Sequence, residues 1–405
     1  MKKILTLFIS FVLACGTLAV LPSCNNATSS DPVIALITLH GESSTYDKNF
    51  IDAFKAACKA KGLKEGQYKI QSNVPEEGEE CYEAAVGFVE EGFKAVFADS
   101  FGHEANMIKA AKANPNVQFG HATGTKAHTE KLSNYHNAFA SIYEGRYLAG
   151  VAAGLKLVEL YGGENGEVAN ENAVVGYVAA WPYAEVISGY TSWFLGVRSV
   201  VPNATMKVSY TSSWYDEAKE GTVATALINA GCKLISQHAD SMGAPNACDK
   251  AGVPNVSYNG GNELSTFVIS SRINWQPYFE LMIDSVTGGA ALPADWTGTI
   301  ETGSVELSAV GKAAAAGTQA KLDEVAAKLA DGSLKLFDCT KFTVKGASLT
   351  SFMADIDDDV GTYSHETEII ATAKDADGKD YYYVNESSKR SAPAFDAIID
   401  GITVL

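Results

Sequence analysis

Residues 174–211 read VVGYVAAWPYAEVISGYTSWFLGVRSVVPNATMKVSYT and contain a complete repeat of strand, helix and strand. The apolar run Val174–Ala179 has the length and β-branched content of a buried strand. Ala184–Val200 is long enough for a crossover helix, and Met206–Thr211 is the next expected strand. The stretch therefore predicts a parallel β-α-β unit, in which the helix covers one face of the sheet.

The same alternation continues on both sides of this unit. The strands and helices expected before it are Val33–Leu39, Tyr46–Lys61, Tyr68–Asn73, Tyr82–Glu91, Ala95–Ala98, Glu104–Ala113, Val117–His121 and Tyr143–Val158. Those expected after it are Glu217–Ala230, Leu234–Gln237, Ala244–Ala251 and Asn255–Tyr258. A glycine-rich loop at 162–166 separates the two runs. The pattern predicts an α/β fold of two doubly wound parallel-sheet lobes joined by a hinge, and ligands of such sheets bind at the carboxyl ends of the strands.

The N-terminus has the features of an export signal. Lys2 and Lys3 precede an apolar run that ends in Leu21-Pro22-Ser23-Cys24, which resembles a bacterial lipobox. Cys15, after Val12-Leu13-Ala14, is the alternative lipidation site. We favour Cys24, because the polar residues 25–30 that follow it are typical of a flexible tether. We therefore expect a lipid-anchored protein at the cell membrane, facing the periplasm or the cell exterior.

The part after residue 275 is less regular. It predicts an Ala/Lys/Glu-rich helix at Ala309–Ala330, an edge strand at Asp380–Val384 and a short helix at Ala394–Ile399. The expected organisation is a signal peptide at 1–23, a tether at 24–31, lobe I at 32–153, lobe II at 165–275, a return to lobe I at 276–345, and a C-terminal segment at 346–405 with an acidic loop on the hinge or lobe II side.

Charge and cysteine content exclude several classes of protein. The formal net charge is −17, and a surface this acidic repels the phosphates of nucleic acids. The five cysteines after Cys24 form no CxxC motif and no paired Cys/His spacing typical of zinc. Cys232 and Cys248 are the first candidates for a disulfide, and buried free thiols are the alternative.

One acidic loop has the spacing of a calcium ligand set. Asp355, Asp357, Asp359 and Glu366 occupy positions one, three, five and twelve of an EF-hand loop. Val360 stands where that loop needs glycine, so we favour a solvated acidic loop and expect no metal site.

Aromatic and polar residues follow the ends of several predicted strands. Exposing a tryptophan ring to water is unfavourable in free energy, so several such rings on loop tips indicate a ligand that covers them. A flat ring ligand would stack on the aromatic side chains and form hydrogen bonds with carboxylates and amides. Each tryptophan could instead seal the hinge. The candidate ligand-binding residues are Tyr46, Asp47, Phe101, Trp181, Trp214, Asp216, Asp240, Asn259, Asn274 and Trp275.

Several of these segments resemble the basic membrane protein family of substrate-binding lipoproteins. The matching segments are 44–53 (STYDKNFIDA), 143–150 (YEGRYLAG), 175–182 with 185–186, 213–216 with 219–220 (SWYD, KE), and 237–241 (QHADS). The resemblance runs from about Val33 to the C-terminus. It implies a type I periplasmic-binding-protein fold, hinge closure on a purine base or nucleoside with Tyr46 as the stacking aromatic, and delivery to an ABC permease. We expect a monomer without cofactors.

Three positions depart from the family pattern. Ser43, Asn259 and Asn274 stand where nucleoside-binding members are expected to carry charged groups that hold ribose. These departures from the family pattern therefore favour a bare base over its nucleoside as the ligand. A sugar ligand and a sensory or surface-interaction lipoprotein remain the alternatives.

The sequence offers little for catalysis. It contains no GxSxG, P-loop or strand-linked GxGxxG motif. His238 beside Asp240 could form an acid/base pair, but a strand-end histidine packed under the ligand or hinge is the simpler interpretation. We expect a binding protein and not an enzyme.

Overall fold

The computed structural model describes residues 31–260, 263–356 and 366–405. The signal peptide, both candidate lipidation cysteines and positions 357–365 of the acidic loop lie outside these residues. Within them, no group of histidine, cysteine and acidic side chains could hold a metal ion. No helix in the same ranges is long and apolar enough to cross a membrane.

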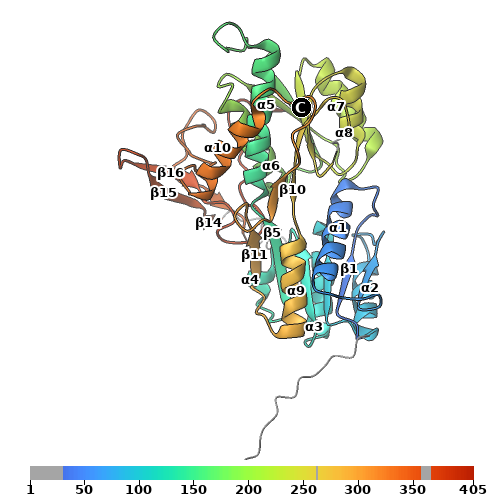
Figure 1. Ribbon diagram of the computed structural model, residues 1–405. Coiled ribbons are helices and arrows are strands. Elements are labelled where there is room, and N and C mark those ends of the chain that lie inside the picture. The colour runs from blue at the N-terminus through green and yellow to red at the C-terminus, as the bar shows by residue number, and fades with distance from the viewer. Residues whose placement is uncertain (1–30, 261–262, 357–365) are drawn as a thin grey trace, which may run out of the picture.

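The first lobe is built on a six-stranded parallel sheet with helices on both faces (Figure 1). Its strand order is β11-β5-β4-β3-β1-β2. The strands are β1 (Ile34–Ile37), β2 (Tyr68–Gln71), β3 (Ala95–Ala98), β4 (Gln118–Ala122), β5 (Tyr135–Ala140) and β11 (Asp295–Gly298). The helices are α1 (Thr45–Ala60), α2 (Glu80–Glu90), α3 (Glu104–Ala113), α4 (Ala127–Glu130) and α9 (Gln276–Gly288). The central strands β1 and β3 are fully buried, as expected for strands covered on both faces.

The second lobe contains a seven-stranded sheet of order β12-β10-β9-β8-β6-β7-β17. Its strands are β6 (Val174–Ala179), β7 (Thr205–Tyr210), β8 (Leu234–His238), β9 (Asn255–Tyr258), β10 (Phe267–Ile273), β12 (Val305–Leu307) and β17 (Ile402–Val404). Its helices are α5 (Ile142–Tyr161), α6 (Ala184–Arg198), α7 (Glu217–Asn229), α8 (Gly243–Ala251) and α10 (Thr318–Ala330). Only β12 runs antiparallel to its neighbour.

The chain passes between the two lobes three times. The crossings lie between β5 and α5, between β10 and α9, and between β11 and β12. Because three segments join the lobes, they can rotate about a hinge while each sheet stays intact. The carboxyl ends of both sets of parallel strands face the space between the lobes.

Helices α5 and α6 pack with unusually close backbones. An added Cβ at Gly150 would lie 2.0 Å from the carbonyl oxygen of Trp193, and one at Gly196 would lie 2.1 Å from that of Tyr147. Glycine at both positions is therefore what allows the two helices to cross. This contact places α5 in the core of the second lobe, together with the fully buried Trp193.

The structure moves two of the expected lobe boundaries. The first lobe ends before α5, near residue 141 and not 153, because α5 packs on α6. In the expected return segment 276–345, only α9 and β11 lie with the first sheet, whereas β12 joins the second sheet and α10 packs on α5.

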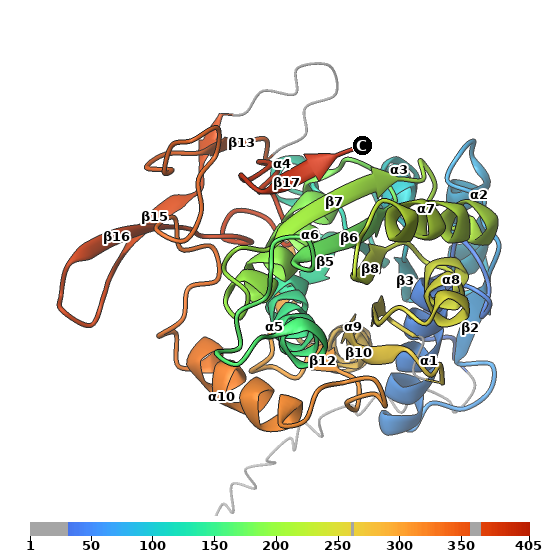
Figure 2. The ribbon, with the colours of Figure 1, turned by 90° about the horizontal axis from the view of Figure 1, so that it is seen from above.

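Residues 331–405 are called the C-terminal extension, and its described parts, 331–356 and 366–405, pack beside the second lobe. The extension includes β13 (Met353–Ala354), β14 (Thr367–Glu368) and the hairpin β15 (Ile370–Lys374) and β16 (Asp380–Val384), and it ends in β17. An aromatic cluster of Phe337, Phe342, Phe352 and Phe395 forms its core. Viewed from above, β17 lies beside β7, and the β15–β16 hairpin projects away from both lobes (Figure 2).

Three expectations for local structure are wrong. Ala394–Ile399 forms no helix, and the N–H groups of Ala394 and Phe395 donate to the Glu386 carboxylate. The helix expected from Ala309 begins only at Thr318, after Gly317 at φ 78°. Cys232 and Cys248 form no disulfide, and the five cysteines of the described residues are buried free thiols.

Candidate functional site

A pocket lies between the lobes, where the carboxyl ends of the strands meet. We call it the inner pocket, and it holds about 360 Å³ of space, part of it open to solvent. It is lined by Leu39, Tyr46, Asp47, Ser100, Phe101, Thr123, Glu185, Trp214, His238 and Asp240.

The start of helix α1 positions two pocket residues from the first lobe. The Ser44 side chain accepts a hydrogen bond from the Asp47 N–H and so begins the helix. The Asp47 carboxylate accepts from the His40 N–H at 2.7 Å, and its other oxygen lies 3.4 Å from His40 Nδ1. The Tyr46 hydroxyl donates to the Asp99 carbonyl oxygen at 2.8 Å. The ring of Tyr46 is thereby fixed at the pocket wall.

The second lobe contributes a buried polar network. His238 Nε2 lies 3.2 Å from Glu185 Oε1. Beneath them, the Arg146 guanidinium lies 3.8 Å from the centre of the Tyr258 ring and donates to Tyr177 and to the Gln237 carbonyl oxygen. Burial, reinforced by Arg146, lowers the pKa of His238 to about 4. His238 is therefore neutral near pH 7, and its contact with Glu185 is a hydrogen bond of a neutral imidazole.

The carboxyl groups around the pocket differ in their protonation. Burial raises the pKa of Asp99 and of Asp240 well above the usual range, and the nearby charge of Asp47 adds to both shifts. Burial also acts to raise the pKa of Asp47, but hydrogen bonds from His40 and Ser44 outweigh it and lower the value. The site therefore combines an ionised acceptor at Asp47 with Asp240, whose burial favours a neutral carboxyl that can also donate.

The two lobes touch each other around the inner pocket. The Thr45 N–H and hydroxyl both donate to the Asp240 carbonyl oxygen, at 2.8 and 3.1 Å. The rings of Phe101 and Tyr183 stack with centres 5.1 Å apart. These contacts join the first lobe to the second, so the inner pocket is the interior of an apposed cleft.

Half of the residues proposed from the sequence lie in this pocket. Tyr46, Asp47, Phe101, Trp214 and Asp240 line it. They follow strands β1, β3, β7 and β8, and so lie at the carboxyl ends of both sheets, where the sequence predicted the site.

The other five lie elsewhere. Trp275 is fully buried in the core of the first lobe, with its ring 4.3 Å from that of Phe50. Asp216 begins helix α7 by accepting from the Lys219 N–H. Trp181 does not line the inner pocket, and its ring stacks on Tyr183. Asn259 and Asn274 line a separate groove, whose walls also come from both lobes.

The positions of Ser43, Asn259 and Asn274 bear on the prediction that a bare base is preferred over its nucleoside. Ser43, Asn259 and Asn274 all line the groove and not the inner pocket. The Asn274 amide donates to the Gly303 carbonyl oxygen and to Glu306. Neutral residues at these positions therefore say nothing about what the inner pocket holds.

Sequence reasoning missed five pocket residues: Leu39, Ser100, Thr123, Glu185 and His238. Leu39, Ser100 and Thr123 directly follow first-lobe strands or lie one residue beyond, but none has an unusual side chain. Thr123 adopts φ 62°, which sequence does not reveal for a threonine. His238 was interpreted as a strand-end histidine packed under the ligand or the hinge, and it lies at the end of β8.

The comparison with known families now bears on this geometry. The family described as Bmp, ABC transporter substrate-binding protein PnrA-like, matches residues 36–330. The chain belongs to this family. Its members are solute-binding components of transporters and not enzymes. The match ends where the C-terminal extension begins.

Two relatives and two solved structures extend the comparison. A Haloferax volcanii protein whose name proposes it as an ABC transporter glucose-binding protein is 34% identical over 213 residues, which are 51% of this chain and 50% of that protein. A purine-binding protein of Brucella abortus is 33% identical over 193 residues, 46% of this chain and 50% of that protein. The chain thus spans about half the length of these curated relatives.

The solved structures concern the fold alone. ABC transporter solute-binding proteins from Conexibacter woesei and Aeropyrum pernix superpose with TM-scores of 0.60 and 0.62 at 18% and 14% identity. The first covers 75% of this chain and 98% of its own, the second 75% and 92%. The Bmp-family chain therefore has the type I periplasmic-binding-protein fold predicted from its sequence.

Proposed function

We propose that this protein captures a purine base or nucleoside in the inner pocket and delivers it to an ABC permease. The observation that carries the proposal is the lining of that pocket. Tyr46 and Phe101 of the first lobe and Trp214 of the second present aromatic side chains, and Asp47, Glu185 and Asp240 supply polar groups beside them. Aromatic faces hold a flat ring by stacking, while carboxyl groups accept from its N–H and amino groups.

The name of the Brucella abortus relative supports a purine, and that of the Haloferax volcanii relative supports a sugar as the second candidate. Aromatic side chains also pack on sugar rings. The carboxyl-rich, three-aromatic pocket favours the purine, because a planar ring can use aromatic side chains from both lobes at once.

A thermal-shift screen tests the proposal. A ligand that binds only the folded protein stabilises it by an amount that grows with the logarithm of the ligand concentration divided by the dissociation constant. We expect adenine, guanine, adenosine, guanosine or inosine to raise the melting temperature by several degrees, while glucose and arabinose leave it unchanged. If only a sugar raised the melting temperature, the protein would instead be assigned to sugar transport. No shift with any of these compounds would reject it. Chromatography after incubation with the nucleosides should show no product.

We also propose that Cys24 carries the lipid anchor and places the protein at the outer side of the cell membrane as a monomer. The lipobox-like ending and the polar stretch 25–30 support this proposal. Replacing Cys24 by alanine is expected to release the protein from membranes, whereas Cys15→Ala should leave it anchored. Fractionation of cells expressing the full chain, followed by mass spectrometry of the mature N-terminus, measures both. Soluble wild-type protein with an unmodified Cys24 would contradict the anchor.

A further inference from the structure

A second cavity adjoins the inner pocket, and the C-terminal extension forms one of its walls. We call it the outer compartment; it holds about 950 Å³, part of it open to solvent. Phe101, Thr123 and Glu185 line both spaces. Arg390, Pro393 and Asp396 of the extension line only the outer one. The two spaces are therefore neighbours, with Glu185 at their junction.

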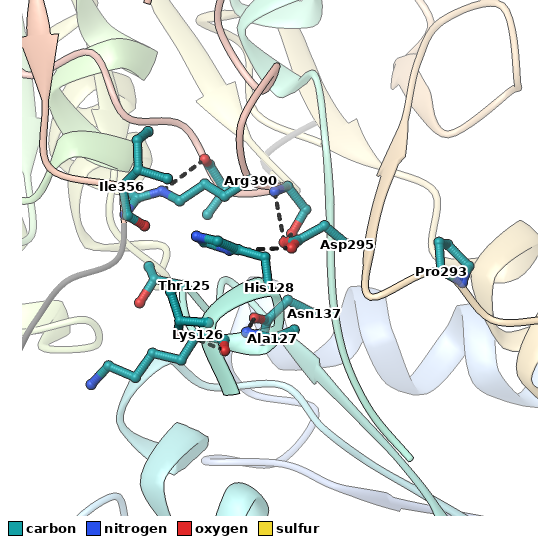
Figure 3. A network of polar contacts seen from close by, with 12 residues as sticks. Thr125, Lys126, Ala127, His128, Asn137, Pro293, Asp295, Ile356 and Arg390 are labelled. Atoms are coloured by element: carbon teal, nitrogen blue, oxygen red, sulfur yellow. Dashed lines mark hydrogen bonds and ion pairs between the residues drawn. The ribbon is translucent and has the colours of Figure 1, made fainter. Parts of the chain in front are cut away.

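The wall contributed by the extension is held in place by many hydrogen bonds. The buried Arg390 guanidinium donates to the carbonyl oxygens of Asp355, Ile356, Ala392 and Pro393 at 2.9 to 3.2 Å. In Figure 3 its side chain extends toward Ile356. These hydrogen bonds engage the guanidinium group, so Arg390 fixes the backbone of residues 390–396 to that of Asp355 and Ile356.

The same wall is attached to both lobes. The Ser391 N–H and hydroxyl both donate to Asp295 Oδ1, at 2.9 and 3.0 Å, and Asp295 begins strand β11 of the first lobe. His128 points at the same carboxylate, with Nδ1 3.4 Å from Oδ2 (Figure 3). Phe395, four residues further on, is buried in the core of the second lobe. The wall thus stays beside the cleft when the lobes are apposed.

The chemistry of the outer compartment selects among ligand substituents. Glu185 and Asp396 bring carboxyl groups to it, and Thr123 and Thr125 bring hydroxyls. Both kinds of group accept hydrogen bonds from hydroxyl or amino substituents, and the carboxylates repel a phosphate. The Arg390 guanidinium is committed to backbone carbonyl oxygens, so it gives an anion little compensation.

Resting on the proposed function, we propose that the outer compartment binds an uncharged, hydroxylated substituent of the ring held in the inner pocket. The pentose of a nucleoside has this chemistry. The C-terminal extension then contributes to ligand specificity, although it lies outside the segment that the family shares.

Calorimetry with adenine and adenosine tests this inference on the full mature chain. Wild-type protein is expected to bind adenosine at least as tightly as adenine. Ala184→Trp fills the outer compartment from the start of α6 and should weaken adenosine binding by about tenfold or more, while adenine binding changes less than about twofold. Asp396→Ala should weaken adenosine binding selectively by several-fold. Ala218→Trp, at an exposed position in the first turn of α7, is the matched control and should alter neither affinity.

Three outcomes would overturn the inference. One is a wild-type protein that binds adenine but not adenosine. Another is an equal loss of both ligands in Ala184→Trp, with unfolding excluded by circular dichroism. The third is unchanged adenosine affinity in both Ala184→Trp and Asp396→Ala. If wild-type protein binds neither compound, the same comparison is made with guanine and guanosine; binding of none of these purines would reject the proposed function, and this inference would fall with it.

Discussion

Gly150→Val is expected to destabilise the protein by about 3 kcal/mol or more, or to prevent folding of the second lobe. Any side chain at position 150 meets the backbone carbonyl of Trp193, since even a Cβ would lie 2.0 Å from that oxygen. The carbonyl belongs to helix α6 and cannot rotate away as a side-chain end can. Relief requires the two helices to separate, which would open the core around Trp193. Urea unfolding followed by tryptophan fluorescence measures the change.

Gly87→Ala is the matched control for this prediction. Gly87 also lies inside a helix, α2, but nothing stands within 4 Å of a Cβ built there. Alanine should therefore stabilise the protein by about 0.5–1 kcal/mol, because it loses less backbone entropy than glycine on folding. If Gly150→Val unfolded at the wild-type urea concentration, the close crossing of α5 and α6 would be refuted.

Tyr46→Ala and Trp214→Ala are each expected to weaken purine binding by about 1–3 kcal/mol, the usual loss for one base–aromatic stack. The two rings come from different lobes and line the same inner pocket. Removing either should leave folding largely intact, because neither residue is among the fully buried core side chains. Calorimetry with the best purine from the thermal-shift screen measures the loss.

Two further variants separate stacking from other effects. Tyr46→Phe keeps the ring and removes the hydrogen bond to the Asp99 carbonyl oxygen, so it should retain most of the affinity that Tyr46→Ala loses. Tyr382→Ala changes an exposed aromatic residue of the β15–β16 hairpin and should have no effect on binding. Wild-type affinity in both alanine variants of the pocket would exclude the inner pocket as the purine site.

The strands and helices that the sequence predicted well are those with clear periodicity. Ala95–Ala98, Glu104–Ala113, Val174–Ala179 and Asn255–Tyr258 have the expected bounds. Strands β5 and β10 were missed, because polar residues such as His136, Asn137, Ser270 and Ser271 interrupt their apolar runs. These polar side chains are buried in the folded protein. Many of their hydrogen-bond and packing partners lie elsewhere in the chain, so the local sequence does not reveal the burial.

The candidate site was half predictable for a related reason. Sequence indicates which residues follow a strand but not the direction in which a loop side chain turns. Tyr46 and Trp275 both lie at the start of a helix, yet Tyr46 lines the pocket and Trp275 turns into the first-lobe core. The contribution of residues 390–396 could not be foreseen either, because it depends on the contact between Ser391 and Asp295, 96 residues apart in the chain.

The edge strands β11 and β17 have a consequence for how the molecule is assembled during synthesis. The first sheet is otherwise complete at residue 140, but its edge at β5 is covered only when residues 295–298 arrive. The second sheet leaves β7 uncovered until residues 402–404 pair with it. Unpaired strand edges are sites where one chain can pair with another. Strands β5 and β7 of the nascent chain therefore stay unpaired on one side until residues 295–298 and 402–404 have been made, after which β11 and β17 are the strands exposed at those edges.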